Sequence, residues 1–362
     1  MPSFDDAQQP ALALGPGGLV ALAMLQRGNI TVALSKDGGA SFSEPVVAMD
    51  CAGQARGGRQ RGPRIGIDAR GTITVSAPVT FDAEERKKRY PAPELYLVQS
   101  QDGGKTFSSP LRINLLEKKA PEGLHMLSVS ADGVAHLAWL DISARSGPGQ
   151  DLNYARLVNG ELTDRTTVAR TVCECCAPGL GLDSKGNPTI AWREGGLKNS
   201  RELFLRRSLD GGKRFGAVQR INTSPTLETG CPMSLPTTVV SGDSRRVLVA
   251  WKHVNKSAPH VSWREATAPA PDADLQPQPG GTQDHPCLAL SADGTWSAVW
   301  EETRSGRQSV WYRTSKNGDQ GRQLSAPSDG QAAFPVLVVG AQTTVAYEAK
   351  QGTQLRVFVQ KL

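Results

Sequence analysis

The chain has 362 residues, a formal net charge of +6, 38% hydrophobic residues, 38 glycines and 24 prolines. This length and apolar content suit one domain with an ample core, so we expect residues 1–362 to form a single domain. Basic residues are dispersed without a stripe of interleaved aromatics, which argues against nucleic-acid binding. No run of 18 apolar residues occurs, so we expect no membrane span.

A short phrase, Ser-x-Asp-Gly-Gly-x-x-Phe, occurs three times, and each copy follows an alternating apolar run that is typical of a strand. Glycine permits a positive φ and aspartate bonds the nearby backbone, so the phrase predicts a tight turn. We therefore expect a structural role for its aspartates, which are Asp37, Asp102 and Asp210. Repetition of this kind indicates a repeat architecture.

A second phrase, a very apolar strand, recurs seven times at intervals of 47 to 62 residues. Most copies follow a turn and a shorter apolar run, and a third apolar run comes after each, which indicates a repeated antiparallel meander. A unit of this size cannot bury both faces alone, so we predict an all-β, seven-bladed β-propeller, with six blades as the alternative. Residues 1–8 are predicted to supply the missing outer strand of the last blade. The copies begin at Val20, Thr74, His136, Thr189, Leu248, Ser297 and Thr344.

The six cysteines are the most informative residues outside the repeats. All except Cys51 stand just before the predicted innermost strand of a blade, and these strands line the channel of a propeller. Because the beginnings of the inner strands point to one mouth, we expect thiol, thioether and imidazole groups to converge there. The predicted set is Cys173, Cys175, Cys176, Cys231, Met233, His285, Cys287, His125 and Met126.

Two interpretations of this set compete. Six cysteines in an extracytoplasmic protein can pair as structural disulfides, a vicinal Cys175–Cys176 bond included. Alternatively, cysteine and methionine are soft ligands that favour copper(I), or zinc where methionine is less involved. The Cys-x-Cys-Cys spacing of residues 173–176 is uncommon in plain disulfide frameworks, which favours the metal site, and the two interpretations can coexist.

The Asp-Gly-Gly turns resemble the Asp-box of the sialidase-like, BNR-repeat superfamily. More narrowly, CECCAPGLGLDSKG from Cys173 and GCPMSLP from Gly230 resemble bacterial secreted propellers with a Cys-x-Cys-Cys blade. This resemblance implies export to the periplasm or the exterior. The N-terminal residues do not have the pattern of a signal peptide, so we expect a signal to precede them in the exported precursor.

The sialidase resemblance also implies three arginines that clamp a carboxylate, a Tyr–Glu nucleophile pair and an Asp acid/base. In this chain Pro63-Arg64-Ile65-Gly66 keeps only Arg-Ile of the first arginine motif, and Val79-Thr80-Phe81 replaces the second. We therefore assign no catalytic residue, and an exo-sialidase-type glycoside hydrolase is the alternative. The candidate residues for a small anionic or carbohydrate ligand are Arg64, Arg193, Glu194 and Arg201.

A third class is a protein-docking platform held by structural disulfides, because a propeller fold does not fix a function. Lys252, His253, Glu301 and Glu302 end second strands, where they could line such a surface. The interpretation that we favour is a periplasmic or secreted, monomeric binding protein whose channel mouth holds copper.

Overall fold

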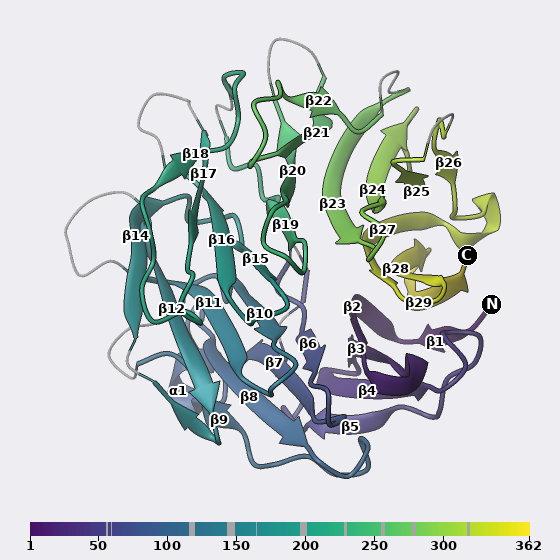
Figure 1. Cartoon of the computed structure of the whole chain (residues 1–362). Coiled ribbons are helices and arrows are strands. Elements are labelled where there is room, and N and C mark those ends of the chain that lie inside the picture. Colours follow the sequence, from purple (N-terminus) through teal and green to yellow (C-terminus); the bar gives the residue numbers. More distant parts are fainter. Residues whose placement is uncertain are drawn as a thin grey trace.

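Seven antiparallel sheets form a ring around a central channel (Figure 1). This arrangement confirms the predicted seven-bladed propeller. The computed structural model describes residues 1–55, 57–58, 60–115, 120–142, 149–163, 165–195, 201–227, 230–254, 258–276, 280–316 and 319–362. Within these ranges the α-helix α1 (Ala83–Arg86) has four residues, and no helix is long and apolar enough to cross a membrane.

In each blade the first strand lines the channel and the later strands follow it outward. Blade 1 consists of β2 (Ala7–Leu14), β3 (Val20–Gln26), β4 (Asn29–Ser35) and β5 (Val46–Met49). Blade 2 consists of β6 (Arg64–Ile67), β7 (Ile73–Val79), β8 (Glu94–Ser100) and β9 (Leu111–Arg112). Blade 3 consists of β10 (His125–Val129), β11 (Ala135–Ile142), β12 (Gln150–Val158) and β13 (Glu161–Leu162), with β14 (Thr166–Val172) also on β12.

The remaining blades have the same layout. Blade 4 consists of β15 (Gly179–Leu182), β16 (Pro188–Arg193), β17 (Leu203–Arg207) and β18 (Gln219–Arg220). Blade 5 consists of β19 (Thr237–Val240), β20 (Val247–His253), β21 (His260–Glu265) and β22 (Ala273–Asp274). Blade 6 consists of β23 (Thr282–Leu290), β24 (Trp296–Arg304), β25 (Arg307–Thr314) and β26 (Arg322–Gln323). Blade 7 consists of β27 (Gln331–Val339), β28 (Thr343–Gln351), β29 (Gln354–Lys361) and β1 (Ser3–Asp5).

The N-terminal strand closes the ring. β1 pairs antiparallel with β29, so the first and last strands of the chain lie side by side in blade 7 (Figure 1). The ring of Phe4 packs edge-on against Phe42 of blade 1 at 6.0 Å between centroids. Residues near both ends of the chain therefore share one sheet, as the sequence predicted.

The inner strands of blades 4 and 5 approach each other so closely that glycine is required. A Cβ atom on Gly179 would collide with the carbonyl of Pro236, and one on Gly181 would lie 2.8 Å from the carbonyl oxygen of Thr238. Glycine inside a strand often marks such an approach of two backbones. The contact holds the loops that precede these two strands beside each other.

Aromatic side chains on the second strands fill the space between blades. Trp251 of β20 is fully buried and packs with Ala191 and Leu205 of blade 4. Large aromatic side chains bury much apolar area, which makes them effective links between neighbouring sheets. The corresponding buried residues in blades 3, 4, 6 and 7 are Trp139, Trp192, Trp300 and Tyr347.

The three Asp-Gly-Gly turns connect third and fourth strands at the end of the sheets where second strands begin. Asp102 accepts hydrogen bonds from the amide and hydroxyl of Thr106, from the hydroxyl of Ser100 and from the amide of Lys105. These donors, those of Thr106 above all, hold the pKa of Asp102 below its usual range. Asp37 has the same partners in its own turn. The turns thus stabilise themselves locally.

We expect Asp102→Ala to lower the midpoint of thermal unfolding by a few degrees, because several donors lose their acceptor at once. Lys105→Ala, in the same turn, removes an exposed side chain and should leave the midpoint unchanged. Circular dichroism melting compares the two. Equal midpoints for both variants would contradict the structural role of the aspartate.

Candidate metal centre and channel cavity

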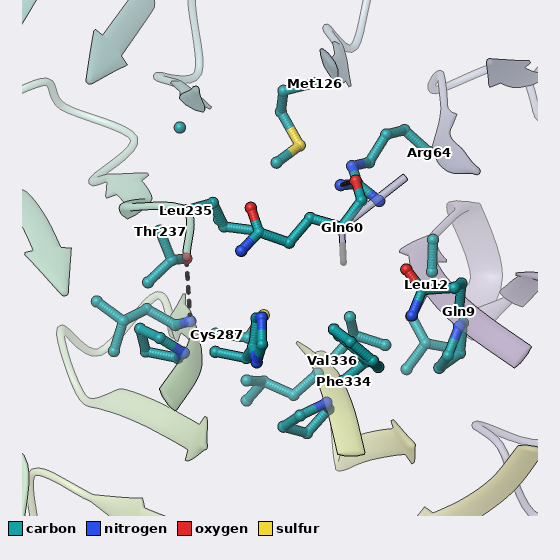
Figure 2. Close-up of a pocket in the computed structure, with 18 of the residues that line it drawn as sticks. Gln9, Leu12, Gln60, Arg64, Met126, Leu235, Thr237, Cys287, Phe334 and Val336 are labelled. Carbon is teal, nitrogen blue, oxygen red and sulfur yellow. Dashed lines mark hydrogen bonds between the residues drawn. The ribbon is translucent and has the colours of Figure 1, made fainter. Parts of the chain in front are cut away.

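The inner strands enclose a cavity of about 240 Å³ in the channel (Figure 2). Each blade contributes one residue at an equivalent position, which follows a proline in every blade except blade 3. Four of the seven side chains are polar or contain sulfur, so the cavity has mixed character. The seven residues are Ala11, Arg64, Met126, Gly179, Thr237, Cys287 and Val336.

Three of the inner strands contain the same irregularity just before this ring of residues. Gln9, His285 and Phe334 adopt left-handed backbone conformations with φ of 53°, 45° and 48°, each directly before a proline. Each lies at a β-bulge in the pairing with the second strand. Bulges redirect side chains next to functional sites. In this protein they bring the rings of His285 and Phe334 within 4.6 Å of each other at the cavity.

His285 lines the cavity, and an ionic network surrounds its imidazole ring. Its Nδ1 lies 3.0 Å from a Glu301 carboxylate oxygen, and its Nε2 is 3.2 Å from the carbonyl oxygen of Met233. Burial alone would lower the pKa of His285, but the carboxylates of Glu301 and Asp284 raise it to about 9. Lys252 Nζ lies 3.0 Å from Asp284 and completes the network. His285 is therefore an imidazolium at neutral pH, and both of its nitrogens face partners.

Arg64 and Cys287 line the same cavity, and the guanidinium of Arg64 is hydrogen-bonded to the backbone. It donates to the carbonyl oxygens of Gln60 at 2.8 Å and Pro63 at 3.0 Å. Burial lowers the pKa of Arg64 to about 10 and raises the pKa of Cys287 to about 11. Cys287 is thus a neutral thiol, and it lies within β23 rather than before the strand as the sequence had indicated.

A second group of sulfurs, which we call the sulfur cluster, consists of Cys173, Cys175, Cys176 and Cys231. The first three belong to the loop between β14 and β15, and their Sγ atoms lie within 4.8 Å of one another. Cys173 Sγ is 3.5 Å from Cys175 Sγ and 3.6 Å from Cys176 Sγ. A disulfide joins Cys175 to Cys231, which precedes β19, with 6.1 Å between the Cα atoms. The two loops that carry the cluster are those held together by the glycine contact of blades 4 and 5.

A buried arginine supplies positive charge to the sulfur cluster. Arg193, at the end of β16, is 1% exposed, and its guanidinium donates to the carbonyl oxygens of Arg201 at 3.0 Å and Lys252 at 2.8 Å. The hydrogen bond between the Cys173 and Cys176 thiols lowers the pKa of Cys173, against the effect of burial, and the charges of Arg193 and Arg201 lower it further. Burial and the neighbouring Cys173 raise the pKa of Cys176. The pair therefore favours one thiolate, on Cys173, and one thiol, on Cys176.

Gln60 links the sulfur cluster to the channel cavity. Its side-chain nitrogen donates to the carbonyl of Met233, two residues beyond Cys231. Its side-chain oxygen accepts from the amide of Ala177 at 3.4 Å, next to Cys176. Gln60 itself lines the cavity (Figure 2). The cluster and the cavity are therefore adjoining but distinct places.

The predicted metal ligands thus divide between two places. Cys173, Cys175, Cys176 and Cys231 converge, whereas Met126, His285 and Cys287 line the cavity. Both nitrogens of His125 are engaged, one with the carbonyl of Gly123 at 3.1 Å and one with the hydroxyl of Ser76 at 3.0 Å. Met233 contributes its backbone carbonyl to Gln60 and His285.

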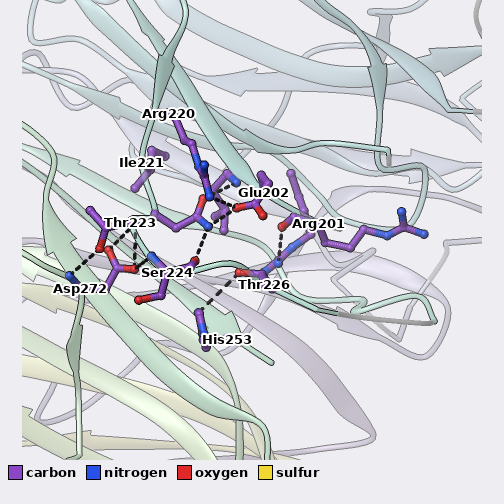
Figure 3. Close-up of polar contacts among 12 residues, drawn as sticks. Arg201, Glu202, Arg220, Ile221, Thr223, Ser224, Thr226, His253 and Asp272 are labelled. Atoms are coloured by element: carbon purple, nitrogen blue, oxygen red, sulfur yellow. Dashed lines mark hydrogen bonds and ion pairs between the residues drawn. The ribbon is translucent and has the colours of Figure 1, made fainter. Parts of the chain in front are cut away.

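The predicted anion-binding residues do not line one cavity. Arg64 lies in the channel, Arg193 is buried beside the sulfur cluster, and Glu194 is exposed. Figure 3 shows the Arg201 side chain extending away from the contacts around Glu202 and Asp272. In that region Glu202 pairs with Arg220 at 2.8 Å, and Asp272 accepts from the amides of Thr223 and Ser224. These contacts tie blade 4 to blade 5 and keep the strand that follows Arg201 in place.

Sequence reasoning missed Gln60 and the role of Arg193. Gln60 lies in a loop between blades, where no repeat register applies. For the bulge residues at the cavity the sequence did offer a signal, because proline restricts the residue that precedes it. Inner strands begin with such pairs, which are Gln9-Pro10, His285-Pro286 and Phe334-Pro335.

Comparisons with solved structures agree with the fold. The structure is similar to an ulvan lyase from a polysaccharide lyase family, with a TM-score of 0.66 at 10% identity over 99% of this chain and 94% of that chain. It is similar to the β-propeller domain of the trilobed protease from Pyrococcus furiosus, with a TM-score of 0.56 at 11% identity over 99% and 97%. It is also similar to a leech intramolecular trans-sialidase, with a TM-score of 0.55 at 12% identity over 98% and 68%. No family model and no curated protein matches the chain. By fold, the chain is a sialidase-like β-propeller.

The ionic network predicts a loss of stability in alkaline solution. The pKa of His285 is raised from 6.5 to about 9, so its contribution is complete below pH 6.5 and is lost as the pH rises through 9. We expect wild-type protein to lose roughly 1–3 kcal/mol more than His285→Gln between pH 6.5 and 10. Urea unfolding at several pH values measures the difference. Parallel pH profiles for the two proteins would contradict the ionic network.

Proposed function

We propose that this protein is an extracytoplasmic propeller that binds one soft metal ion, copper(I) in preference to zinc, through the sulfur cluster in its reduced state. The observation that carries the proposal is the approach of three cysteine Sγ atoms within 4.8 Å of one another. All three sulfurs belong to one short loop between β14 and β15, so little chain has to be ordered when an ion binds.

The donor set suits a soft ion. Cys173, Cys175 and Cys176 offer thiolate sulfur, and soft thiolates select copper(I) and zinc among common metals. Reduction of the disulfide with Cys231 frees the third close sulfur and makes a fourth available. Structural zinc takes four ligands in a tetrahedron, whereas three sulfurs form the close group and the fourth, Cys231, would have to join them from another loop. The softer ion is therefore the better match.

The surrounding charge also suits a metal–thiolate complex. Three thiolates around a monovalent ion carry net negative charge, which is costly to bury without compensation. Arg193 and Arg201 supply positive charge at the position where Cys173 is ionised. The two arginines thus offset the charge that a copper(I)–thiolate centre would introduce.

We propose that the protein is monomeric and that it is located in the periplasm or secreted. Disulfides such as Cys175–Cys231 persist in oxidising compartments. The resemblance to secreted propellers with a Cys-x-Cys-Cys blade supports the same location.

A carbohydrate-active enzyme has less support. The ulvan lyase and the trans-sialidase are enzymes by their names, but at 10% and 12% identity they share only the fold. Among the described residues that line the channel cavity, Arg64 is the one arginine, whereas a sialidase clamps its substrate with three. A small anionic or carbohydrate ligand in this cavity is the second candidate, with Arg64 as its charged contact.

We expect fully reduced protein to bind one equivalent of copper(I) in competition with a chromogenic chelator. Cys173→Ser and Cys176→Ser should each weaken binding by about tenfold or more, because each removes a thiolate from the group. Affinity should fall as the pH is lowered, since protons compete for the sulfurs and the pKa of Cys176 is raised.

The matched control for this titration is Cys51→Ser. Cys51 is a buried free cysteine that packs in the core of blades 1 and 2, so its loss tests nonspecific thiol binding. Circular dichroism establishes that each variant is folded. Equal affinities for wild type and for the Cys173 and Cys176 variants would overturn the proposed centre.

A further inference from the structure

A free cysteine lies directly against the disulfide. Cys173 Sγ is 3.5 Å from Cys175 Sγ, and that sulfur is bonded to Cys231. At this distance the two sulfurs are in contact, with no space for a group between them. Thiol–disulfide exchange proceeds by attack of one sulfur on a disulfide sulfur, and here these two sulfurs are already in contact.

The cysteines on the two sides of the disulfide differ in their exposure to solvent. Cys173 and Cys176 are each 4% exposed, whereas Cys231 is exposed to solvent. An attack by Cys173 on Cys175 therefore expels the sulfur of an exposed residue. Solvation of the leaving thiolate favours this direction of cleavage.

From this arrangement we propose that Cys173 carries out an internal thiol–disulfide exchange that converts the Cys175–Cys231 disulfide into a Cys173–Cys175 disulfide and releases the thiol of Cys231. The Cys173 thiolate forms a bond to Cys175 Sγ, the bond between Cys175 and Cys231 breaks, and the electron pair leaves on Cys231, which takes a proton from water. One disulfide is present before and after, so no external oxidant or reductant is consumed. The step needs no metal and is independent of the proposed copper centre.

The backbone holds the attacking residue in place. The amide of Cys173 donates to the carbonyl oxygen of Arg193 at 2.8 Å, which fixes the start of the loop against β16. Arg193 is itself buried at the end of β16, so this anchor of the loop is held within the protein. Arg193 acts as a positioning residue, because it touches the loop rather than the disulfide.

The loop of Cys231 has anchors other than the disulfide. Lys252 Nζ donates to the carbonyl oxygen of Pro232 at 3.3 Å, and both Gln60 and His285 contact the carbonyl of Met233. Cleavage of the disulfide therefore leaves Cys231 near its former partner, which makes the exchange reversible. The product is an exposed thiol that can react with soft electrophiles or with external disulfides of low molecular weight.

Trapping with N-ethylmaleimide tests the exchange in oxidised, EDTA-treated, full-length protein. Trypsin yields one peptide, 171–185, with Cys173, Cys175 and Cys176, and another, 221–245, with Cys231. The starting disulfide links the two peptides. Exchange followed by trapping separates them, leaving an internal disulfide in 171–185 and one label on Cys231. Mass spectrometry without reduction distinguishes the two states.

We expect the label on Cys231 to accumulate in wild type and in Cys51→Ser at the same rate. In Cys173→Ser the rate should fall by about tenfold or more, because the attacking sulfur is gone. Cys176→Ser keeps the attacking sulfur but loses its hydrogen-bonded neighbour at 3.6 Å, so its rate should fall below that of wild type and stay above that of Cys173→Ser. Circular dichroism verifies the fold of each variant.

Three outcomes would overturn the proposal. The first is an intact peptide link in wild type with label on Cys173, which needs no variant to interpret. The second is equal labelling of Cys231 in wild type and Cys173→Ser, and the third is loss of labelling in Cys176→Ser alone. Because copper titrations use fully reduced protein, failure of the exchange and failure of the copper centre are separate results.

Discussion

The buried charge of Arg193 is the constraint on which the sulfur cluster depends. A guanidinium removed from water costs several kcal/mol unless opposite charge or hydrogen bonds compensate. Two carbonyls accept from it, and among the described residues no carboxylate forms an ion pair with it. The hydrogen bond with Cys176 is the main cause that lowers the pKa of the Cys173 thiol, and the charge of Arg193 lowers it further. Arg193 therefore favours a negatively charged cluster, whether as a free thiolate or as a metal–thiolate centre.

The propeller makes this arrangement possible by bringing two loops of adjacent blades together. Glycines in β15 allow the backbones of blades 4 and 5 to touch, so the loops that precede β15 and β19 meet. Cys175 and Cys231 are 56 residues apart in the chain, yet the repeat places them in a disulfide. The same geometry puts one residue of each blade around the channel cavity. The cluster and the cavity thus arise from a single repeating element.

The fold could be predicted from the sequence because each blade repeats a turn and an apolar second strand, and this strand recurs in all seven copies. The convergence of Cys173, Cys175, Cys176 and Cys231 followed from the same register. The register could not separate the cluster from the cavity, because a β-bulge at His285 shifts Cys287 into β23 and toward the channel. It also gave no sign of Gln60, whose position depends on tertiary hydrogen bonds to Met233 and Ala177.

X-ray absorption at the copper edge tests the central claim most directly. The reduced protein, loaded with one equivalent of copper(I), should show a first shell of sulfur alone at about 2.3 Å, the usual metal–thiolate distance. That shell should lose intensity in Cys176→Ser. A first shell containing nitrogen would instead place the metal at His285 or another histidine and would contradict a centre built from the sulfur cluster.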